Sequence, residues 1–211
     1  MATSAKLDPA DPRVRLQPFL SPPREPVLVD IPEVSLVAVD GKGGPETGPA
    51  QDAGFQEALG AIFSVAYGLH FALKKEGIER SLLPLEALWW SDGGELDLSP
   101  QAMSGWSWRA FTIVPDEATP ERFAAACAEA ARKRDLPGLA RLRLDRWTEG
   151  RSAQLMYVGP YSEERPTIEK LHAFIAANGL RRRGYHHEIY LGDPRRAAPE
   201  KLKTIIRQPV E

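Results

Sequence analysis

The order of the expected elements repeats along this chain. Residues 34–114 read as a strand, a long helix and two further strands, and residues 153–208 read in the same order. A Trp-Ser-Asp-Gly turn follows the third element of the first unit, and a Leu-Gly-Asp-Pro turn follows it in the second. Neither unit alone has enough sheet to bury its apolar face, so we expect the two to share one core.

The repeat predicts the fold class and the domain limits. We expect an α+β fold in which two βαββ repeats are related by a pseudo-twofold axis, with an antiparallel sheet, helices on one side and a central ligand cleft. One domain should cover 27–211, with repeat one at about 34–114, a connecting helix at 119–134 and repeat two at about 139–208. Residues 1–26 hold six prolines, which predicts a loose, proline-rich arm.

Composition and charge argue against several classes of protein. The chain has 27 basic and 29 acidic residues, and this near-balance argues against a nucleic-acid-binding surface. The single cysteine, Cys127, excludes a disulfide framework and a cysteine-rich zinc site. No apolar run of about 18 residues and no secretory signal is visible. We therefore expect a cytoplasmic protein, with a monomer favoured, that has no direct nucleic-acid or membrane partner.

Two patterns invite a cofactor or a metal without supporting one. The glycine loop at 40–44 follows a β-branched run at 34–39, but its spacing matches neither common phosphate-binding motif. His186 and His187 are neighbours in an expected strand, where adjacent side chains point to opposite faces, so they cannot share one metal ion. We expect no cofactor and no metal.

The helix expected at 53–76 has two distinct sides. One stripe of apolar residues follows three- and four-residue spacing and should face the core. A second side is aromatic and includes Tyr67 and Phe71. Two interpretations stay open: the helix packs on both sides, or Tyr67 faces a cavity.

Alternation along the expected strands groups side chains by face. His186, Glu188 and Tyr190 share one face of their strand, and the aliphatic residues take the other. The strands expected at 139–146 and 153–158 follow one another closely, which predicts a hairpin.

The same alternation places tryptophans beside carboxylates. Glu86 shares a face with Trp90, and Trp106 shares a face with Trp108. Such a surface suits flat apolar or cationic aromatic ligands, because it offers stacking faces, ring quadrupoles and an anionic partner. The alternatives are that the tryptophans only pack in the core and that Glu188 pairs with an arginine. Whether Glu86 reaches the same cleft as Glu188 stays open. The candidate ligand-binding residues are Tyr67, Glu86, Trp90, Trp106, Trp108 and Glu188.

Three segments of the second half combine unusual residues. They are Gly-Pro-Tyr at 159–161 with Glu164, the run Gly-Tyr-His-His-Glu-Ile-Tyr-Leu-Gly-Asp-Pro-Arg-Arg at 184–196, and Lys-Leu-Lys-Thr-Ile-Ile-Arg-Gln-Pro-Val at 201–210. Together they resemble the GyrI-like small-molecule-binding family, the bacterial effector-binding domains. The resemblance covers about 27–210. The chain shows no DNA-binding module, so it resembles the stand-alone branch of that family.

The resemblance implies a cleft between two βαββ repeats that takes bulky aromatic, often cationic, compounds. A glutamate lies at the cleft floor in the family, and Glu188 holds that position here. Some stand-alone members hydrolyse the cyclopropane ring of DNA-alkylating cyclopropanoid toxins, and others are described as protecting DNA gyrase. Tyr157 stands where relatives often carry a histidine, which departs from the family pattern.

Three functions follow as hypotheses. In a hydrolase, Glu188 would orient or deprotonate the attacking water, and Tyr190, Tyr157 or Tyr67 would donate to the departing oxygen. The catalytic candidates are therefore Glu188, Tyr157 and Tyr190. In a non-catalytic binding protein, Glu188 would be the counter-charge to a cationic ligand. A gyrase-protecting factor would need an exposed patch outside the cleft, and the sequence shows no obvious one.

Overall fold

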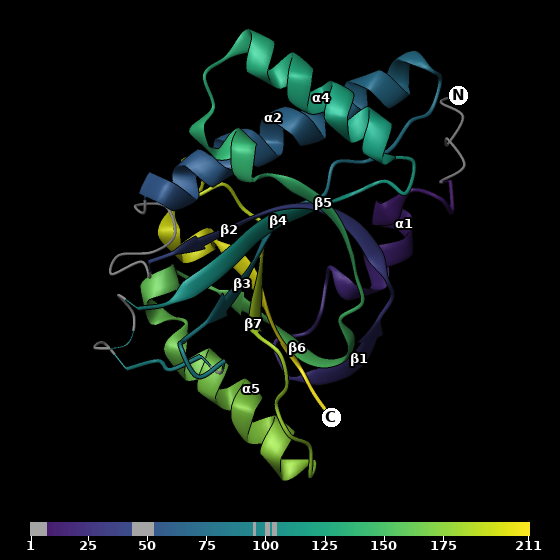
Figure 1. Ribbon diagram of the computed structural model, residues 1–211. Coiled ribbons are helices and arrows are strands. Elements are labelled where there is room, and N and C mark those ends of the chain that lie inside the picture. Colours follow the sequence, from purple (N-terminus) through teal and green to yellow (C-terminus); the bar gives the residue numbers. More distant parts are fainter. Residues whose placement is uncertain (1–7, 44–52, 95, 100–101, 103–104) are drawn as a thin grey trace.

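The computed structural model describes residues 8–43, 53–94, 96–99, 102 and 105–211, which contain one eight-stranded antiparallel sheet (Figure 1). The strand order across the sheet is β1-β6-β8-β7-β3-β4-β2-β5. The strands are β1 (Val27–Ile31), β2 (Val34–Lys42), β3 (Leu85–Trp90), β4 (Ser107–Val114), β5 (Arg143–Trp147), β6 (Gly150–Val158), β7 (His186–Tyr190) and β8 (Lys203–Pro209). The α-helices are α1 (Pro12–Leu16), α2 (Ala53–Lys75), α4 (Pro120–Lys133) and α5 (Arg165–Ala177).

Each half of the sheet has the same strand order outward from the centre. β3 pairs with β7 in the middle; β4 and then β2 follow on one side, and β8 and then β6 on the other. Helix α2 connects β2 to β3, and α5 connects β6 to β7. The predicted order of strand, helix, strand and strand is confirmed in both units.

The sheet curls, because a very short link joins strands near its two ends. β5 is the last strand of the order, whereas β6 lies one strand from the other end. Only Thr148 and Glu149 separate them in the chain, a link of at most about 11 Å. The resulting arc is visible in Figure 1. The predicted hairpin of these two strands is wrong, since β5 pairs with β2 and β6 pairs with β1 and β8.

The outer face of the sheet, which includes Ala87 and Trp89 of β3, is covered by the two connecting helices. Helix α2 packs on it through Phe55, and α5 packs on it through Leu171 and Ile175. In Figure 1, α2 and α4 lie together over one end of the sheet and α5 lies at the other. The expectation of helices on one side is therefore met by α2 and α5.

The inner face of the curl, which includes Leu88 and Phe111, is covered by the N-terminal segment. Leu16 of α1 joins this inner cluster and is only 3% exposed. From the far end of the sheet, Trp147 packs edge-on against Phe111 and against His187, with ring centroids 5.7 Å apart in each case. Coverage of both faces explains why every residue of β7 is buried.

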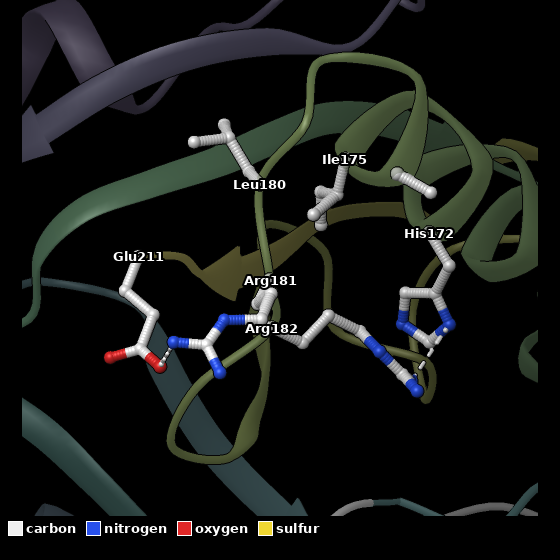
Figure 2. A pocket seen from close by; sticks show the side chains of 7 residues that line it. His172, Ile175, Leu180, Arg181, Arg182 and Glu211 are labelled. Atoms are coloured by element: carbon white, nitrogen blue, oxygen red, sulfur yellow. Dashed lines mark hydrogen bonds and ion pairs between the residues drawn. The ribbon is translucent and has the colours of Figure 1, made fainter.

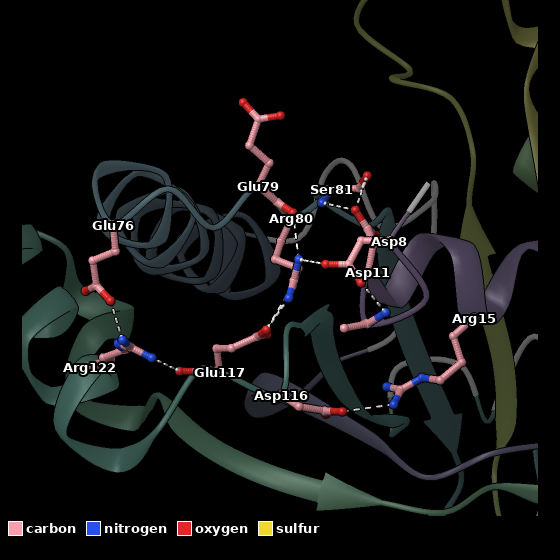
Figure 3. Close-up of polar contacts among 11 residues, drawn as sticks. Asp8, Asp11, Arg15, Glu76, Glu79, Arg80, Ser81, Asp116, Glu117 and Arg122 are labelled. Carbon is pink, nitrogen blue, oxygen red and sulfur yellow. Dashed lines mark hydrogen bonds and ion pairs between the residues drawn. The ribbon is translucent and has the colours of Figure 1, made fainter. Parts of the chain in front are cut away.

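Residues 8–26 are part of this fold, so the expectation of a loose arm is wrong for them. Pro12 occupies the first turn of α1, where its missing N–H costs nothing, and Asp11 is the N-cap. The Asp11 carboxylate also accepts hydrogen bonds from the backbone N–H and hydroxyl of Ser81, at 2.8 and 2.9 Å. Arg15 pairs with Asp116 at 2.9 Å (Figure 3). Prolines here begin a short helix instead of preventing one.

Helices α2 and α4 match the ranges expected for them, 53–76 and 119–134, to within one residue at each end. α2 buries the expected apolar stripe, but Tyr67 and Phe71 are 48% and 55% exposed, so its aromatic side does not pack against a second layer. Thr119 caps α4, with Pro120 in its first turn. Cys127 is half-buried, and burial raises the pKa of its thiol. Among the helices described, none is long and apolar enough to cross a bilayer.

Candidate functional site

Glu188 lies at the centre of the sheet and points to its outer face. It pairs across the ladder with Ala87 of β3 and Ile206 of β8, and it is 9% exposed. The hydroxyl of Tyr190 donates to Oε2 of Glu188 at 2.7 Å, and Nε2 of His186 lies 3.2 Å from Oε1. The three residues that alternation placed on one face therefore form a hydrogen-bonded group.

Aromatic rings surround this group. Nε1 of Trp89 donates to the Tyr190 hydroxyl oxygen at 3.1 Å, and the Tyr161 ring meets that of Tyr190 edge-on with centroids 5.6 Å apart. Trp106 lies 6.0 Å from Trp89, centroid to centroid. Burial, followed by the charge of Glu188, raises the pKa of Tyr190 well above its usual value. Tyr190 is therefore a neutral hydrogen-bond donor at any ordinary pH.

A second carboxyl group, Glu164, lies close enough to Glu188 for their charges to interact. It is 4% exposed and stands at the N-cap position of α5. Burial raises the pKa of Glu164 well above its usual value, and the negative charge of Glu188 raises it further. In the sequence, Glu164 stood out only as part of the family motif that begins with Gly-Pro-Tyr at 159–161. Glu164 lies outside the strands, so side-chain alternation could not identify it as a site residue.

A groove of about 1310 Å³ runs along the aromatic side of α2. Its buried lining includes Phe55 and Tyr190, and its exposed lining includes Tyr67 and Phe71. Tyr161 also lines it. Ligand pockets ordinarily enclose about 300–1,000 Å³, so this groove has room for a large ligand. Of the two readings of α2, the one in which Tyr67 faces a cavity fits the structure.

Glu86 and Trp90 lie on the opposite face from Glu188. The register pairs Glu86 with Ile189, so its side chain enters the inner face and its Oε2 lies 2.9 Å from Nε2 of His187. Trp90 stacks on Tyr185 at 4.3 Å. These two candidates share a face, as alternation predicted, but the structure does not bring them to the Glu188 side.

Trp106 and Trp108 share the outer face, as predicted, within one core cluster. Trp108 is fully buried and meets Phe55 edge-on at 5.0 Å. Its indole lies against Gly41 of β2, where a Cβ atom would come within 2.1 Å of the ring. Trp106 donates from Nε1 to the carbonyl of Asp97 at 2.9 Å. Packing therefore accounts for Trp108, and Trp106 lies beside Trp89 at the edge of the same cluster.

Tyr157 lies in the cluster under α5 and uses its hydroxyl locally. That hydroxyl donates to the carbonyl of Pro160 at 2.8 Å. Burial, followed by the charge of Glu164, raises the pKa of Tyr157 to about 12. Tyr157 is therefore near enough to Glu164 to feel its charge, but the Tyr157 hydroxyl already donates its hydrogen bond to the backbone.

The inner face holds a separate network of charged groups centred on Glu149. The two Glu149 oxygens lie 2.9 Å from Nδ1 of His187 and 2.9 Å from Nη1 of Arg207. Burial alone would raise the pKa of Glu149, but these positive charges outweigh it and lower the pKa to about 2. Burial alone would lower the pKa of His187, but Glu149 and Glu86 raise it. Within the described ranges, no three His, Cys, Asp or Glu residues are arranged to hold a metal ion.

The fold and the groove define a small-molecule-binding protein of the α+β class, and comparison with known proteins gives the family. Residues 88–211 match the GyrI-like small molecule binding domain. The chain therefore belongs to the GyrI-like family. No curated protein is similar enough to count as a match.

Solved structures of similar length support this assignment. An uncharacterized conserved protein from Listeria innocua is 36% identical, with a TM-score of 0.84 over 95% of this chain and 99% of that one. A hydrolase from Listeria innocua is 34% identical, with a TM-score of 0.80 over 95% and 99% of the two chains. The EcmrR C-terminal domain, at 12% identity and a TM-score of 0.53 over 89% and 97%, shares the fold.

Proposed function

We propose that this protein binds flat aromatic compounds in the groove and hydrolyses an activated cyclopropane ring in them, as a protection against DNA-alkylating cyclopropanoids. One observation carries the proposal: Tyr190, which lines the groove together with other aromatic residues, is hydrogen-bonded to the buried carboxylate of Glu188, and Glu164 is near enough to Glu188 for their charges to interact. The shared strand order of the two halves supports a pseudo-twofold relation of two βαββ repeats around the cleft.

The proposed reaction adds one water to the substrate. The water oxygen attacks the strained CH2 carbon and transfers a proton to Glu188. The cyclopropane C–C bond breaks, and its electron pair moves through the conjugated dienone to the oxygen, which becomes a phenol on gaining a proton. Glu164, whose pKa is raised by burial and by the charge of Glu188, supplies that proton. Two carboxyl groups with different proton affinities are the usual arrangement for paired acid and base catalysis.

The aromatic lining supplies orientation. Tyr161 and Tyr190 present ring edges and faces at the buried end, while Tyr67 and Phe71 extend the lining towards solvent. Stacking of this kind holds a planar ligand with little conformational freedom. General acid and base catalysis contributes about 10²–10⁴-fold, which is useful here because ring strain already lowers the barrier.

Two similar proteins that are described as hydrolases support a hydrolytic function. The 34% identical protein from Listeria innocua is described as a hydrolase, and it matches this chain over nearly its whole length. A second hydrolase from the same organism is 35% identical. We extend hydrolysis to this chain on that basis, together with the paired carboxyl groups.

Mass spectrometry tests the proposal. A synthetic spirocyclopropyl dienone with a planar aromatic tail is incubated with a substoichiometric amount of the protein. The expected result is a ring-opened product one water heavier, formed in many equivalents per protein. Intact compound after prolonged incubation, when the protein is folded by circular dichroism, would reject hydrolysis.

Sequestration without chemistry is the second candidate, favoured by the near-complete burial of Glu188 and by the engagement of both its oxygens. A matched pair of planar dyes, one cationic and one neutral, separates the two functions. If Glu188 is only a counter-charge, the wild-type protein binds the cation more tightly and consumes no cyclopropane.

A further inference from the structure

Four buried charged residues on the inner face of the sheet take no part in the proposed reaction. His187 of β7 lies between two carboxyl groups: its Nδ1 is 2.9 Å from Oε1 of Glu149, and its Nε2 is 2.9 Å from Oε2 of Glu86. The second oxygen of Glu149 lies 2.9 Å from Nη1 of Arg207. All four side chains are buried. We call Glu86, Glu149, His187 and Arg207 the inner-face clamp.

The two contacts of His187 indicate the protonation state of its ring. An ionised carboxylate only accepts hydrogen bonds, so a ring nitrogen that faces one at this distance has to be a donor. The contact with Glu149 is a hydrogen bond, whereas the contact with Glu86 is a close ion pair without the alignment of one. A lone pair on Nε2 would face the negative charge of Glu86 across 2.9 Å, which is repulsive. A ring that carries hydrogen on both nitrogens is an imidazolium.

The balance of charge in the clamp leads to the same state. Glu86 and Glu149 supply two negative charges and Arg207 supplies one positive charge, so a protonated His187 makes the clamp neutral. A neutral His187 would leave one negative charge without compensation among buried side chains, which is strongly unfavourable.

Other charged residues on the inner faces of β2, β4 and β5 form a separate set. Asp40 pairs with Arg109 at 2.8 Å and with Arg143 at 2.9 Å. Arg143 also pairs with Asp145 at 2.5 Å. This set has two positive and two negative charges, so it leaves the balance around His187 unchanged.

A second histidine shows what burial does without carboxyl partners. His172 of α5 lines a pocket of about 370 Å³, where Nη1 of Arg182 lies 3.1 Å from its Nδ1 (Figure 2). Burial, then the charges of Arg182 and His186, lowers the pKa of His172 to about 4. Burial acts in the same direction on His187, but its carboxyl neighbours outweigh burial and raise the pKa of that ring.

The clamp joins parts of the chain that are far apart in the sheet order. Glu149 lies in the two-residue link that closes the curl, and its backbone carbonyl accepts a hydrogen bond from Arg183. Nε of Arg207 donates to Oε1 of Gln154 at 2.9 Å, and Nε2 of Gln154 donates to the carbonyl of Phe19 at 3.3 Å. The clamp therefore connects the centre of the sheet to the closing link and to the N-terminal segment that covers the inner face.

We propose that His187 is a buried imidazolium whose charge holds the curl of the sheet closed, and that loss of its proton loosens the closing link and the N-terminal segment. This device goes beyond the proposed function and does not depend on it. Because the pKa of His187 is raised on folding, its stabilising effect is complete below the unfolded value of about 6.5. The effect declines as pH rises from there through the folded value, so the clamp weakens in alkaline conditions.

Nitrogen NMR of the wild-type protein near pH 7 tests the charge on His187. The chain has four histidines, and the ring signals that disappear in His187→Gln belong to His187. If that variant fails to fold, the ring signals that Glu86→Gln shifts identify them. We expect both nitrogens of this ring to carry hydrogen. A bare nitrogen in the His187 ring would place the proton on Glu86 or Glu149 and would overturn the proposal.

Urea unfolding near pH 8 tests the balance of charge. In the wild-type background, Glu86→Gln should lower the urea midpoint, because it removes a partner of the imidazolium. In the His187→Gln background, the same change should raise the midpoint, because it removes the uncompensated charge and leaves Glu149 paired with Arg207. A lower midpoint in both backgrounds would contradict the proposal.

The pH dependence is measured against the double variant Glu86→Gln/His187→Gln, whose clamp keeps only the pair of Glu149 and Arg207. We expect the stability advantage of the wild type over this variant to be largest near pH 6 and to shrink steadily towards pH 9. His172→Gln is the control: the pKa of His172 is lowered, so its effect should be constant above about pH 7. A constant advantage of the wild type over the double variant would overturn the proposal.

Trypsin cleavage tests the loosening of the N-terminal segment, which contains Arg13, Arg15 and Arg24. At one fixed pH near 8, His187→Gln should be cut in this segment faster than the wild type, and the double variant should fall between them. Equal rates for His187→Gln and the wild type would show that the charge of His187 does not hold this segment.

Discussion

Tyr190 and Glu188 are two residues apart in β7 and lie on the same face of the strand. The Tyr190 hydroxyl donates a hydrogen bond to Oε2 of Glu188 at 2.7 Å. The same hydroxyl accepts from Nε1 of Trp89 at 3.1 Å. Tyr190, which lines the groove, thus links the central carboxylate to the aromatic lining.

Tyr190→Phe should reduce both stability and activity. The variant leaves the buried Trp89 N–H and one oxygen of Glu188 without a partner, which costs about 1–3 kcal/mol. Urea unfolding measures this cost. Tyr185→Phe, on the exposed ring that stacks on Trp90, is the control and should change stability little. Equal stability of the two variants would contradict the role given to the Tyr190 hydroxyl.

Glu164→Gln should change how stability depends on pH. Because the pKa of Glu164 is raised on folding, its contribution is complete below the unfolded pKa and is lost as pH rises through the folded one. The wild type should therefore lose stability relative to Glu164→Gln as pH rises above the unfolded pKa of a glutamate, which is about 4.3. Turnover by the variant should fall about 10²–10⁴-fold if Glu164 is the acid. Parallel stability curves would show that Glu164 is ionised in the fold.

Glu149→Gln should destabilise the protein strongly. It leaves Arg207 and His187 on the inner face without their shared counter-charge, a loss of about 3–5 kcal/mol for a buried pair. Glu163→Gln, on an exposed residue, is the matched control.

The pKa of Glu149 is lowered to about 2, so its stabilising effect is present above the unfolded value and disappears as pH falls towards 2. Denaturant titrations at neutral and acidic pH measure both effects, and a loss below about 1 kcal/mol at pH 7 would argue against the network.

Gly41→Ala should destabilise the sheet, although the residue is exchanged for one with a single extra carbon. The added Cβ would meet the Trp108 indole at 2.1 Å, and overpacking of this kind costs about 1–3 kcal/mol. Gly93→Ala, which has no atom within 4 Å of its added Cβ, is the control. Thermal unfolding measures the difference, and we expect a lower midpoint for Gly41→Ala than for Gly93→Ala. Equal midpoints would refute close packing at Gly41.

The face shared by His186, Glu188 and Tyr190 could be predicted because strand side chains alternate whatever the partner strands are. The repeated order of elements could be predicted for a similar reason, since apolar periodicity and turn residues are local signals. Both rest on information contained within each segment, and the structure bears out both.

What the sequence did not predict depends on pairing between segments. Alternation within β3 could not tell that Ala87, and not Glu86, lies opposite Glu188, because register is set across strands. The curl imposed by the link at Thr148 and Glu149 brings β5 back over His187, which no local pattern indicates. Burial of Glu164, at the N-cap of α5, depends on how that helix packs in the folded chain, so its sequence position carried no signal apart from the family motif.

The central claim concerns Glu188 as the base, and Glu188→Gln tests it most directly. Gln keeps the shape and can still accept from Tyr190, but it cannot take a proton from water. Ring-opened product from the spirocyclopropyl dienone is quantified by mass spectrometry, and binding of the same compound is followed by tryptophan fluorescence. We predict that Glu188→Gln folds, binds the neutral compound and loses turnover by about 10²–10⁴-fold. Full turnover by folded Glu188→Gln would contradict the account.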